Sequence, residues 1–275
     1  MDALRIGGRK LIPGKIPILI AGPCVLENFD DALRVALECA EAAAREGFFY
    51  IFKSSYLKDN RSSIDSYAGP GLDKGLEMLA GVKAKAKVPL LTDVHCRDEV
   101  PRVKDVVDVI QIPAFLVRQT RLIVAAAQTG AVLNLKKSQM LSPEDMGNAV
   151  AKARTAGAGG VMVTERGTSF GYNNLVVDFT AFPRMRPFGA PLIFDATHSL
   201  QLPGGLGKRS GGRPEFVSTL SRAAVAAGCD GLFIETHFAP LDCRCDAEAM
   251  LPLAELGRLL AETKRLFELV RGFGT

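Results

Sequence analysis

The chain has no tryptophan, only four tyrosines, and aromatic residues make up just 7% of its 275 amino acids. Proteins that bind single-stranded nucleic acid stack bases on aromatic side chains, and DNA-binding domains gather basic residues on one face. Here the formal net charge is +4, and the basic residues are spread along the whole sequence. The sequence therefore predicts no nucleic-acid partner, and its small cationic excess suits a site for small anionic substrates.

Long apolar runs are also missing. No segment reaches the ~20 consecutive apolar residues that span a bilayer, and residues 1–6 lack the apolar core of a signal peptide. We therefore expect no membrane association and a cytoplasmic location. The six cysteines are scattered along a large chain, so reduced thiols are expected rather than a disulfide framework.

What the chain does have is a regular alternation of short apolar runs with longer amphipathic stretches, which is typical of parallel strands covered by helices. The predicted strands are residues 16–21, 48–53, 89–94, 109–113, 131–136, 160–165, 191–196 and 231–236. Eight such βα units favour a (β/α)8 TIM barrel that forms one catalytic domain over residues 1–275. Residues 1–15 are predicted to form an N-terminal hairpin extension outside the barrel. A doubly wound open sheet is the alternative, because spacing alone does not give the order of the strands.

The helices between these strands differ in how clearly they are marked. A helix over residues 31–46 is expected to be capped by Asn28 and stopped by Gly47. The last helix is expected over about residues 248–271, whereas Pro183 interrupts a weak sixth helix near residues 177–186. Two long loops, residues 54–71 and 199–213, follow strands and are predicted to lie on the catalytic face.

Polar or reactive side chains stand at the ends of all eight predicted strands. They are Cys24, Lys53, Asp93 with His95, Gln111, Lys136 with Lys137, Glu165 with Arg166, Asp195 with His198, and Glu235 with His237. Because barrel enzymes take their catalytic groups from the carboxyl ends of strands, the set as a whole predicts a polar active site. Five cations stand at or shortly after these strand ends and could neutralise a substrate with several negative charges: Lys53, Lys58, Arg61, Lys136 and Arg166.

A second group consists of metal-ligand types. It comprises Cys24, His198, Glu235 and Asp246. A thiolate among the ligands argues for Fe2+, Zn2+ or Mn2+ rather than Mg2+ or Ca2+. In the competing scheme Cys24 is a nucleophile with His198 as its base, but that scheme leaves the five cations unexplained. The Cys243-Arg244-Cys245 spacing could indicate a second metal or redox site, although simple loop thiols are the favoured interpretation.

Several segments together resemble 3-deoxy-D-manno-octulosonate 8-phosphate synthases, the 2-dehydro-3-deoxyphosphooctonate aldolases. The segments are Ile20-Ala21-Gly22-Pro23-Cys24, Phe52-Lys53-Ser54-Ser55, Lys58-Asp59-Asn60-Arg61-Ser62-Ser63, Thr92-Asp93-Val94-His95, Gln111-Ile112-Pro113-Ala114-Phe115-Leu116, Asn134-Leu135-Lys136-Lys137, Thr164-Glu165-Arg166-Gly167, Asp195-Ala196-Thr197-His198-Ser199-Leu200-Gln201-Leu202-Pro203-Gly204 and Ile234-Glu235-Thr236-His237. They cover nearly the whole chain in the family's order. The resemblance implies a TIM barrel, usually a homotetramer, that joins phosphoenolpyruvate to arabinose 5-phosphate in lipopolysaccharide biosynthesis.

The resemblance also implies roles for individual residues. Phosphoenolpyruvate would be held by Lys53, Ser55, Lys58, Gln111, Lys136 and Arg166. Asn60 and Asp93 would meet the sugar, Arg61 and Ser62 would take its phosphate, and Phe115 would reach in from a neighbouring subunit. Among the substrate-binding residues and the metal ligands, those expected to take part in catalysis are His198, Lys136, Asp93 and Asn60. The loop over residues 201–213 would close over the site and exclude water.

Cys24 is the residue that implies metal dependence, since metal-free members of the family carry asparagine there. Strand alternation favours Lys136 over Lys137 in the pocket only weakly, because the register is unknown. The segment 241–250 is unusual for the family, so Asp242 and Glu248 are alternatives to Asp246 as the fourth ligand.

Two other functions remain open from the sequence. The nearest is the sister synthase that uses erythrose 4-phosphate to make a heptulosonate, although the Asn60-Arg61-Ser62-Ser63 run favours the five-carbon sugar. The other is a non-catalytic barrel that binds sugar phosphates.

Overall fold

The computed structural model describes residues 3–61, 63–204 and 211–273. Eight strands form the ring at its centre: β3 (Ile18–Gly22), β4 (Phe49–Lys53), β5 (Leu90–Asp93), β6 (Val109–Ile112), β7 (Val132–Lys136), β8 (Gly160–Glu165), β11 (Leu192–Asp195) and β14 (Gly231–His237). Each is parallel to its neighbour in sequence order, and β14 closes the ring by pairing with both β11 and β3. The predicted barrel is therefore confirmed, and the alternative of an open sheet is wrong.

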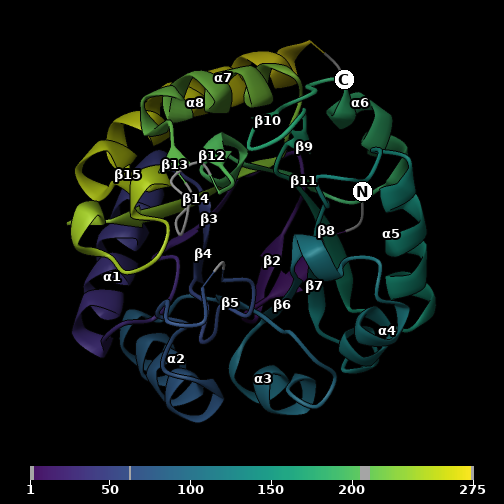
Figure 1. The fold of residues 1–275 in the computed structure, drawn as a ribbon. Coiled ribbons are helices and arrows are strands. Elements are labelled where there is room, and N and C mark those ends of the chain that lie inside the picture. The colour runs from purple at the N-terminus through teal and green to yellow at the C-terminus, as the bar shows by residue number, and fades with distance from the viewer. Residues whose placement is uncertain (1–2, 62, 205–210, 274–275) are drawn as a thin grey trace.

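Helices surround this ring (Figure 1). They are α1 (Phe29–Glu46), α2 (Leu72–Ala86), α3 (Val100–Val106), α4 (Thr120–Gln128), α5 (Asp145–Thr155), α6 (Ala181–Met185), α7 (Val217–Ala226) and α8 (Leu253–Gly272). In the part of the chain that the structure describes, no helix combines the length and apolar character needed to cross a bilayer.

Helix α1 shows how local sequence sets these elements. The Asn28 side chain accepts a hydrogen bond from the Asp31 backbone N–H, and Gly47 ends the helix in the left-handed conformation. Both ends were predicted, because asparagine is a strong N-cap and glycine adopts positive φ without a Cβ clash. Between them Val35, Ala36 and other small apolar residues are buried against the barrel, so the helix packs closely on the strands.

The last helix begins later than predicted. Residues Ala247–Ala249 form a 3-10 turn, and the short strand β15 (Leu251–Pro252) then pairs with β14 before α8 starts at Leu253. Pro252 was the available signal, because proline favours the start of a helix and disfavours its interior. The weak sixth helix is indeed short, with Pro183 in its first turn, where no intrahelical N–H bond is lost.

Short hairpins stand at the two ends of the barrel. The N-terminal hairpin, β1 (Leu4–Ile6) with β2 (Arg9–Leu11), was predicted. Leu4, Ile6 and Leu11 pack against the apolar side chains that fill the barrel's interior, and Figure 1 shows β2 inside the ring as seen along its axis. At the other end the loops carry two small hairpins that were not predicted: β9 (Thr168–Ser169) with β10 (Leu175–Val176), and β12 (Gln201–Leu202) with β13 (Gly211–Gly212). One end of the barrel is thus plugged, and the other is framed by loops.

Candidate active site

A cavity of about 480 Å³ lies at the carboxyl end of the strands. This is the end at which barrel enzymes carry their active sites, and the size suits a small-molecule ligand. Eleven of the predicted site residues line it: Lys53, Lys58, Asn60, Arg61, Asp93, Gln111, Phe115, Lys136, Arg166, His198 and Asp246. The structure thus gathers side chains from seven strands and their loops around one space.

Positive charge dominates the inner wall of this cavity. Lys53 is 1% exposed, and Lys136 and Arg166 are each 6% exposed. Burial lowers the pKa of Lys136, with Asp195 opposing that shift, and burial likewise lowers the pKa of Arg166. Among the described residues Arg166 Nη1 has no hydrogen-bond partner, whereas Nη2 donates to Gln201 Oε1 at 3.0 Å. A buried guanidinium with a free N–H is suited to bind an anion.

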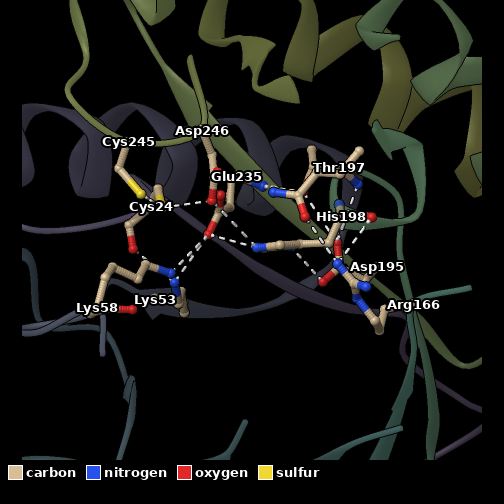
Figure 2. Close-up of polar contacts among 12 residues, drawn as sticks. Cys24, Lys53, Lys58, Arg166, Asp195, Thr197, His198, Glu235, Cys245 and Asp246 are labelled. Atoms are coloured by element: carbon tan, nitrogen blue, oxygen red, sulfur yellow. Dashed lines mark hydrogen bonds and ion pairs between the residues drawn. The ribbon is translucent and has the colours of Figure 1, made fainter. Parts of the chain in front are cut away.

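Asp195, at the end of β11, connects the cationic wall to His198. Its Oδ2 lies 2.6 Å from Lys136 Nζ and 2.8 Å from His198 Nδ1. Burial raises the pKa of this carboxyl, but His198 and Lys136 lower it by more, so Asp195 is ionised well below its usual range. Because Nδ1 faces Asp195, the other ring nitrogen of His198 points towards Glu235 and Asp246 (Figure 2). This is the arrangement by which a carboxylate fixes the tautomer of a metal-binding histidine.

The four residues predicted to hold a metal come together at this point. His198 Nε2 is 3.4 Å from Glu235 Oε1 and 4.0 Å from Asp246 Oδ2, and Cys24 Sγ is 3.2 Å from Asp246 Oδ2. Two overlapping groups result, His198 with Glu235 and Asp246, and Cys24 with Cys245 and Asp246, each with its ligand atoms within 4.8 Å of one another. Separations of 3 to 4 Å are those expected of ligands around one ion with bonds of ~2.0–2.3 Å. The donor set therefore fits a divalent transition metal.

Glu235 lies at the centre of the charges (Figure 2). Its Oε1 is 3.1 Å from Lys53 Nζ and 3.8 Å from Lys58 Nζ. Burial raises the pKa of this carboxyl, but the charges of His198 and the two lysines outweigh burial and bring the pKa down to about 2. Glu235 thus belongs to the group of metal-type ligands and also contacts the lysines of the cationic wall.

Cys24 is completely buried beside this group. Burial, the contact with Cys245 and the charge of Asp246 raise the pKa of the Cys24 thiol well above its usual value. Without a metal the thiol is therefore protonated, and a metal ion that binds it must displace the proton.

The alternatives to Asp246 lie elsewhere. Glu248 lines the cavity but belongs to neither ligand group, and Asp242 lines a separate small cavity behind the loop. Asp246 itself adopts a left-handed backbone conformation with φ 49°, which an aspartate tolerates better than most residues.

The neighbouring lysines Lys136 and Lys137 point to different places. Lys136 faces the cavity, whereas Lys137 is fully buried, 3.5 Å from Glu165, and donates to the carbonyl oxygens of Ser138 and Leu141. Lys137 therefore braces the loop beyond β7.

Other predicted residues take less direct positions. Ser55 does not line the cavity; its hydroxyl donates to Asp93 Oδ1 at 2.5 Å from behind the wall. Phe115 is 57% exposed and lies at the rim of this chain's own cavity. Ser62 lies outside the described residues, as do residues 205–210 of the predicted closing loop.

Sequence reasoning missed two features. Asp195 was noted at a strand end, but its double contact to Lys136 and His198 was not foreseen, although the three-residue spacing to His198 was a usable signal. Cys245 was taken as a loop thiol, yet it is 1% exposed and its Sγ lies 2.7 Å from Cys24 Sγ. No feature of the sequence pairs these two cysteines.

Comparisons with known proteins agree with this architecture. Residues 10–271 match the DAHP synthetase I family. A 2-dehydro-3-deoxyphosphooctonate aldolase from Trichlorobacter lovleyi is 52% identical over 268 residues, which cover 98% of each chain. Proteins of the same name from Nitratidesulfovibrio vulgaris and a Geobacter species are 53% and 50% identical, and each alignment covers at least 96% of both chains. The chain belongs to the DAHP synthetase I family, and within that family to the 2-dehydro-3-deoxyphosphooctonate aldolases.

Proposed function

We propose that the protein condenses phosphoenolpyruvate with arabinose 5-phosphate and water, giving 3-deoxy-D-manno-octulosonate 8-phosphate and phosphate for lipopolysaccharide biosynthesis. The observation that carries the proposal is the meeting of several buried cations with a set of metal-type ligands in one cavity. The relatives' shared name, at about 50% identity over almost the full length, supports the same reaction.

Phosphoenolpyruvate is proposed to bind the inner, cationic wall. Lys53, Lys136 and Arg166 supply buried positive charge there, and Lys58 and Gln111 complete the wall. Arg166 can direct its free Nη1 to a phosphate or carboxylate oxygen, which is a strong charge-assisted contact in a site of low dielectric. Ser55 contributes by fixing Asp93 from behind rather than by touching the substrate.

Arabinose 5-phosphate is proposed to occupy the outer part of the cavity. Asn60 and Asp93 line that part and offer hydrogen bonds to sugar hydroxyls, while Arg61 and Ser62 would take the phosphate. Burial raises the pKa of Asp93, but His95 and Lys58 hold it well below its usual range, so Asp93 acts as an acceptor.

In the reaction, carbon 3 of phosphoenolpyruvate attacks the aldehyde carbon of the sugar, and the aldehyde oxygen takes up a proton. Carbon 2 gains positive character and is captured by water, which loses one proton and leaves a hydroxyl group. The bond from carbon 2 to the phosphate oxygen then breaks as this hydroxyl becomes the ketone carbonyl, and its proton leaves with the phosphate. A divalent transition ion held by Cys24, His198, Glu235 and Asp246 would supply Lewis acidity to the aldehyde or to the water. Asp195 keeps both Lys136 and His198 in place throughout.

The ion is proposed to be Fe2+, Zn2+ or Mn2+, because the ligand set mixes a thiol and an imidazole with two carboxylates. We further propose a cytoplasmic homotetramer. Large apolar side chains exposed in the loops that follow β6, β7 and β8 support association: Phe115, Met140, Phe170 and Tyr172 are 57%, 76%, 69% and 97% exposed. Sedimentation of the purified protein measures the oligomer directly.

The assay for the reaction is phosphate release from phosphoenolpyruvate with either sugar phosphate. We expect turnover with arabinose 5-phosphate and little with erythrose 4-phosphate. A preference for erythrose 4-phosphate would assign the chain to the heptulosonate synthases, and phosphate release with neither sugar would indicate a binding protein.

Metal dependence is tested separately. We expect a strong chelator to abolish activity and Mn2+ or Fe2+ to restore it. Cys24→Ala should lose metal and activity together, whereas Cys24→Asn should keep measurable metal-free activity if the metal chiefly orients groups. Cys96→Asn, at an exposed thiol, is the control. Full activity of the metal-stripped wild type would refute the metal assignment and leave the synthase assignment standing.

A further inference from the structure

Cys245 has no part in the proposed reaction, yet it lies against one of the proposed metal ligands. The Sγ atoms of Cys24 and Cys245 are 2.7 Å apart, although 221 positions separate the two residues in the sequence. The side chains are 0% and 1% exposed and pack with Val25 and Met250 in a small cluster of their own. Two free thiols that lie far apart in the sequence are thus in direct sulfur-to-sulfur contact inside the protein.

The distance discriminates between two uses of such a pair. Two sulfurs bound to one tetrahedral ion with bonds of ~2.3 Å stand roughly 3.8 Å apart. A disulfide bond is ~2.0 Å long. At 2.7 Å the two sulfurs are nearer to bonding distance than to the spacing of two ligands on the same ion.

We propose that Cys24 and Cys245 form a reversible disulfide that competes with the metal for Cys24. This rests on the proposed function only in taking Cys24 as a metal ligand. The closure of the pair needs little backbone movement, because the two sulfurs already touch. The site would thus be active when reduced and loaded with metal, and closed when oxidised.

The oxidant is a hydroperoxide such as hydrogen peroxide, small enough to reach the cavity. Cys243, Arg244 and Asp246 line the cavity and Cys245 lies between them in sequence, so of the two paired thiols we take Cys245 as the one that is oxidised first. Its sulfur attacks a peroxide oxygen, the O–O bond breaks, one water leaves and a sulfenic acid forms. The Cys24 sulfur then attacks that sulfur, the S–O bond breaks and a second water leaves. Two thiols and one peroxide thus give one disulfide and two waters.

Disulfide formation has consequences on both sides of the site. Cys24 no longer offers a thiolate, so His198, Glu235 and Asp246 remain as a harder and smaller ligand set. Arg61 Nη1 donates to Cys245 Sγ at 3.0 Å, so the proposed sugar-phosphate arginine contacts the same sulfur. Conversely, a metal that holds Cys24 withholds it from Cys245, so metal binding and oxidation oppose each other.

The experiment compares metal-stripped and metal-loaded full-length protein exposed to hydrogen peroxide. In the stripped protein we expect intact mass to fall by two hydrogens, and peptide mapping to show a Cys24–Cys245 cross-link that dithiothreitol removes. Mn2+ or Zn2+ added beforehand should slow its formation. Calorimetric titration of the oxidised protein should show metal affinity reduced at least about tenfold, and reduction should restore it.

Two variants test the pairing. Cys245→Ser keeps all four proposed ligands and should form no disulfide at Cys24, whereas Cys243→Ser, two residues away in the same loop, should behave like the wild type. Three results would each overturn the proposal. They are a Cys243–Cys245 cross-link, a loss of free thiols in the stripped protein without any cross-link, and an unchanged metal affinity after cross-linking. These readouts do not use turnover, so a failed sugar-phosphate assay leaves them intact and refutes only the proposed function.

Discussion

The two ends of the barrel are made from the same eight strands and carry opposite kinds of side chain. At the amino end Leu4, Ile6 and Leu11 of the hairpin complete an apolar interior, which stabilises the fold by about 25 cal/mol per Å² buried. At the carboxyl end Lys53 and Glu235 are each 1% exposed, and burying such charges costs stability unless they are paired. The comparison indicates that stability and function are separated along the strands, so substitutions at the two ends should fail in different ways.

The largest effect on stability is expected at the amino end. Leu11→Ala removes a fully buried side chain from the plugged interior and should lower the free energy of unfolding by about 2–5 kcal/mol. Activity per folded molecule should stay near the wild-type value. Denaturant unfolding measures the loss, and Leu241→Ala, at a leucine that is 79% exposed, is the control. A strong loss of kcat with little loss of stability would break the proposed separation.

The opposite result is expected at the carboxyl end. Arg166→Ala removes a charge-assisted contact to phosphate and should cost at least about 2 kcal/mol of transition-state stabilisation, or about 30-fold in kcat/KM. Its stability should change little, because removal of one of several buried like charges offsets the loss of the hydrogen bonds that Nη2 donates to Gln201 and His198. Arg184→Ala, at an exposed arginine paired with Glu144, should leave kcat/KM unchanged. Near-normal efficiency of the Arg166 variant would remove this residue from the site.

A smaller effect is expected at the rim of the cavity. Asn60→Ala should weaken turnover of arabinose 5-phosphate by about 1 kcal/mol, because one hydrogen bond to a sugar hydroxyl is lost. Asn148→Ala, at an exposed asparagine on α5, is the matched control. The measurement is steady-state kinetics at varied sugar concentration. If the Asn60 and Asn148 variants give the same values, Asn60 makes no contact with the sugar.

The last expected difference concerns the stability of the metal-free protein in acid. The pKa of Glu235 is lowered from 4.5 to about 2, since His198 and the lysines outweigh burial. A carboxyl whose pKa is lower in the folded protein stabilises the fold at any pH above its pKa in the unfolded chain. This contribution is lost as the pH falls from 4.5 towards 2. We expect the free energy of unfolding to fall over that range less steeply in Glu235→Gln. Identical slopes in the two proteins would show that Glu235 contributes no such linkage.

The fold was predictable from the sequence to a greater extent than the site. Each barrel strand was placed within two residues, because buried parallel strands leave short apolar runs between amphipathic helices. Whether Lys136 or Lys137 enters the cavity depends on the register of β7, which the chain alone does not reveal. The contact between Cys24 and Cys245 depends on how the loop after β14 folds back, and no local pattern encodes that path.

The pairing of β14 with β3 has a consequence for how the protein is made. During synthesis β3 emerges early, but Gly231 of its partner is translated only near the end, so one edge of the growing sheet stays open until then. Cys24 follows β3 and Glu235 lies on β14, so the same late pairing that shuts the ring also assembles the proposed metal centre. An ion bound by both residues would link the two strands whose pairing closes the ring. The supply of metal to the nascent chain would then influence how much protein reaches the folded state.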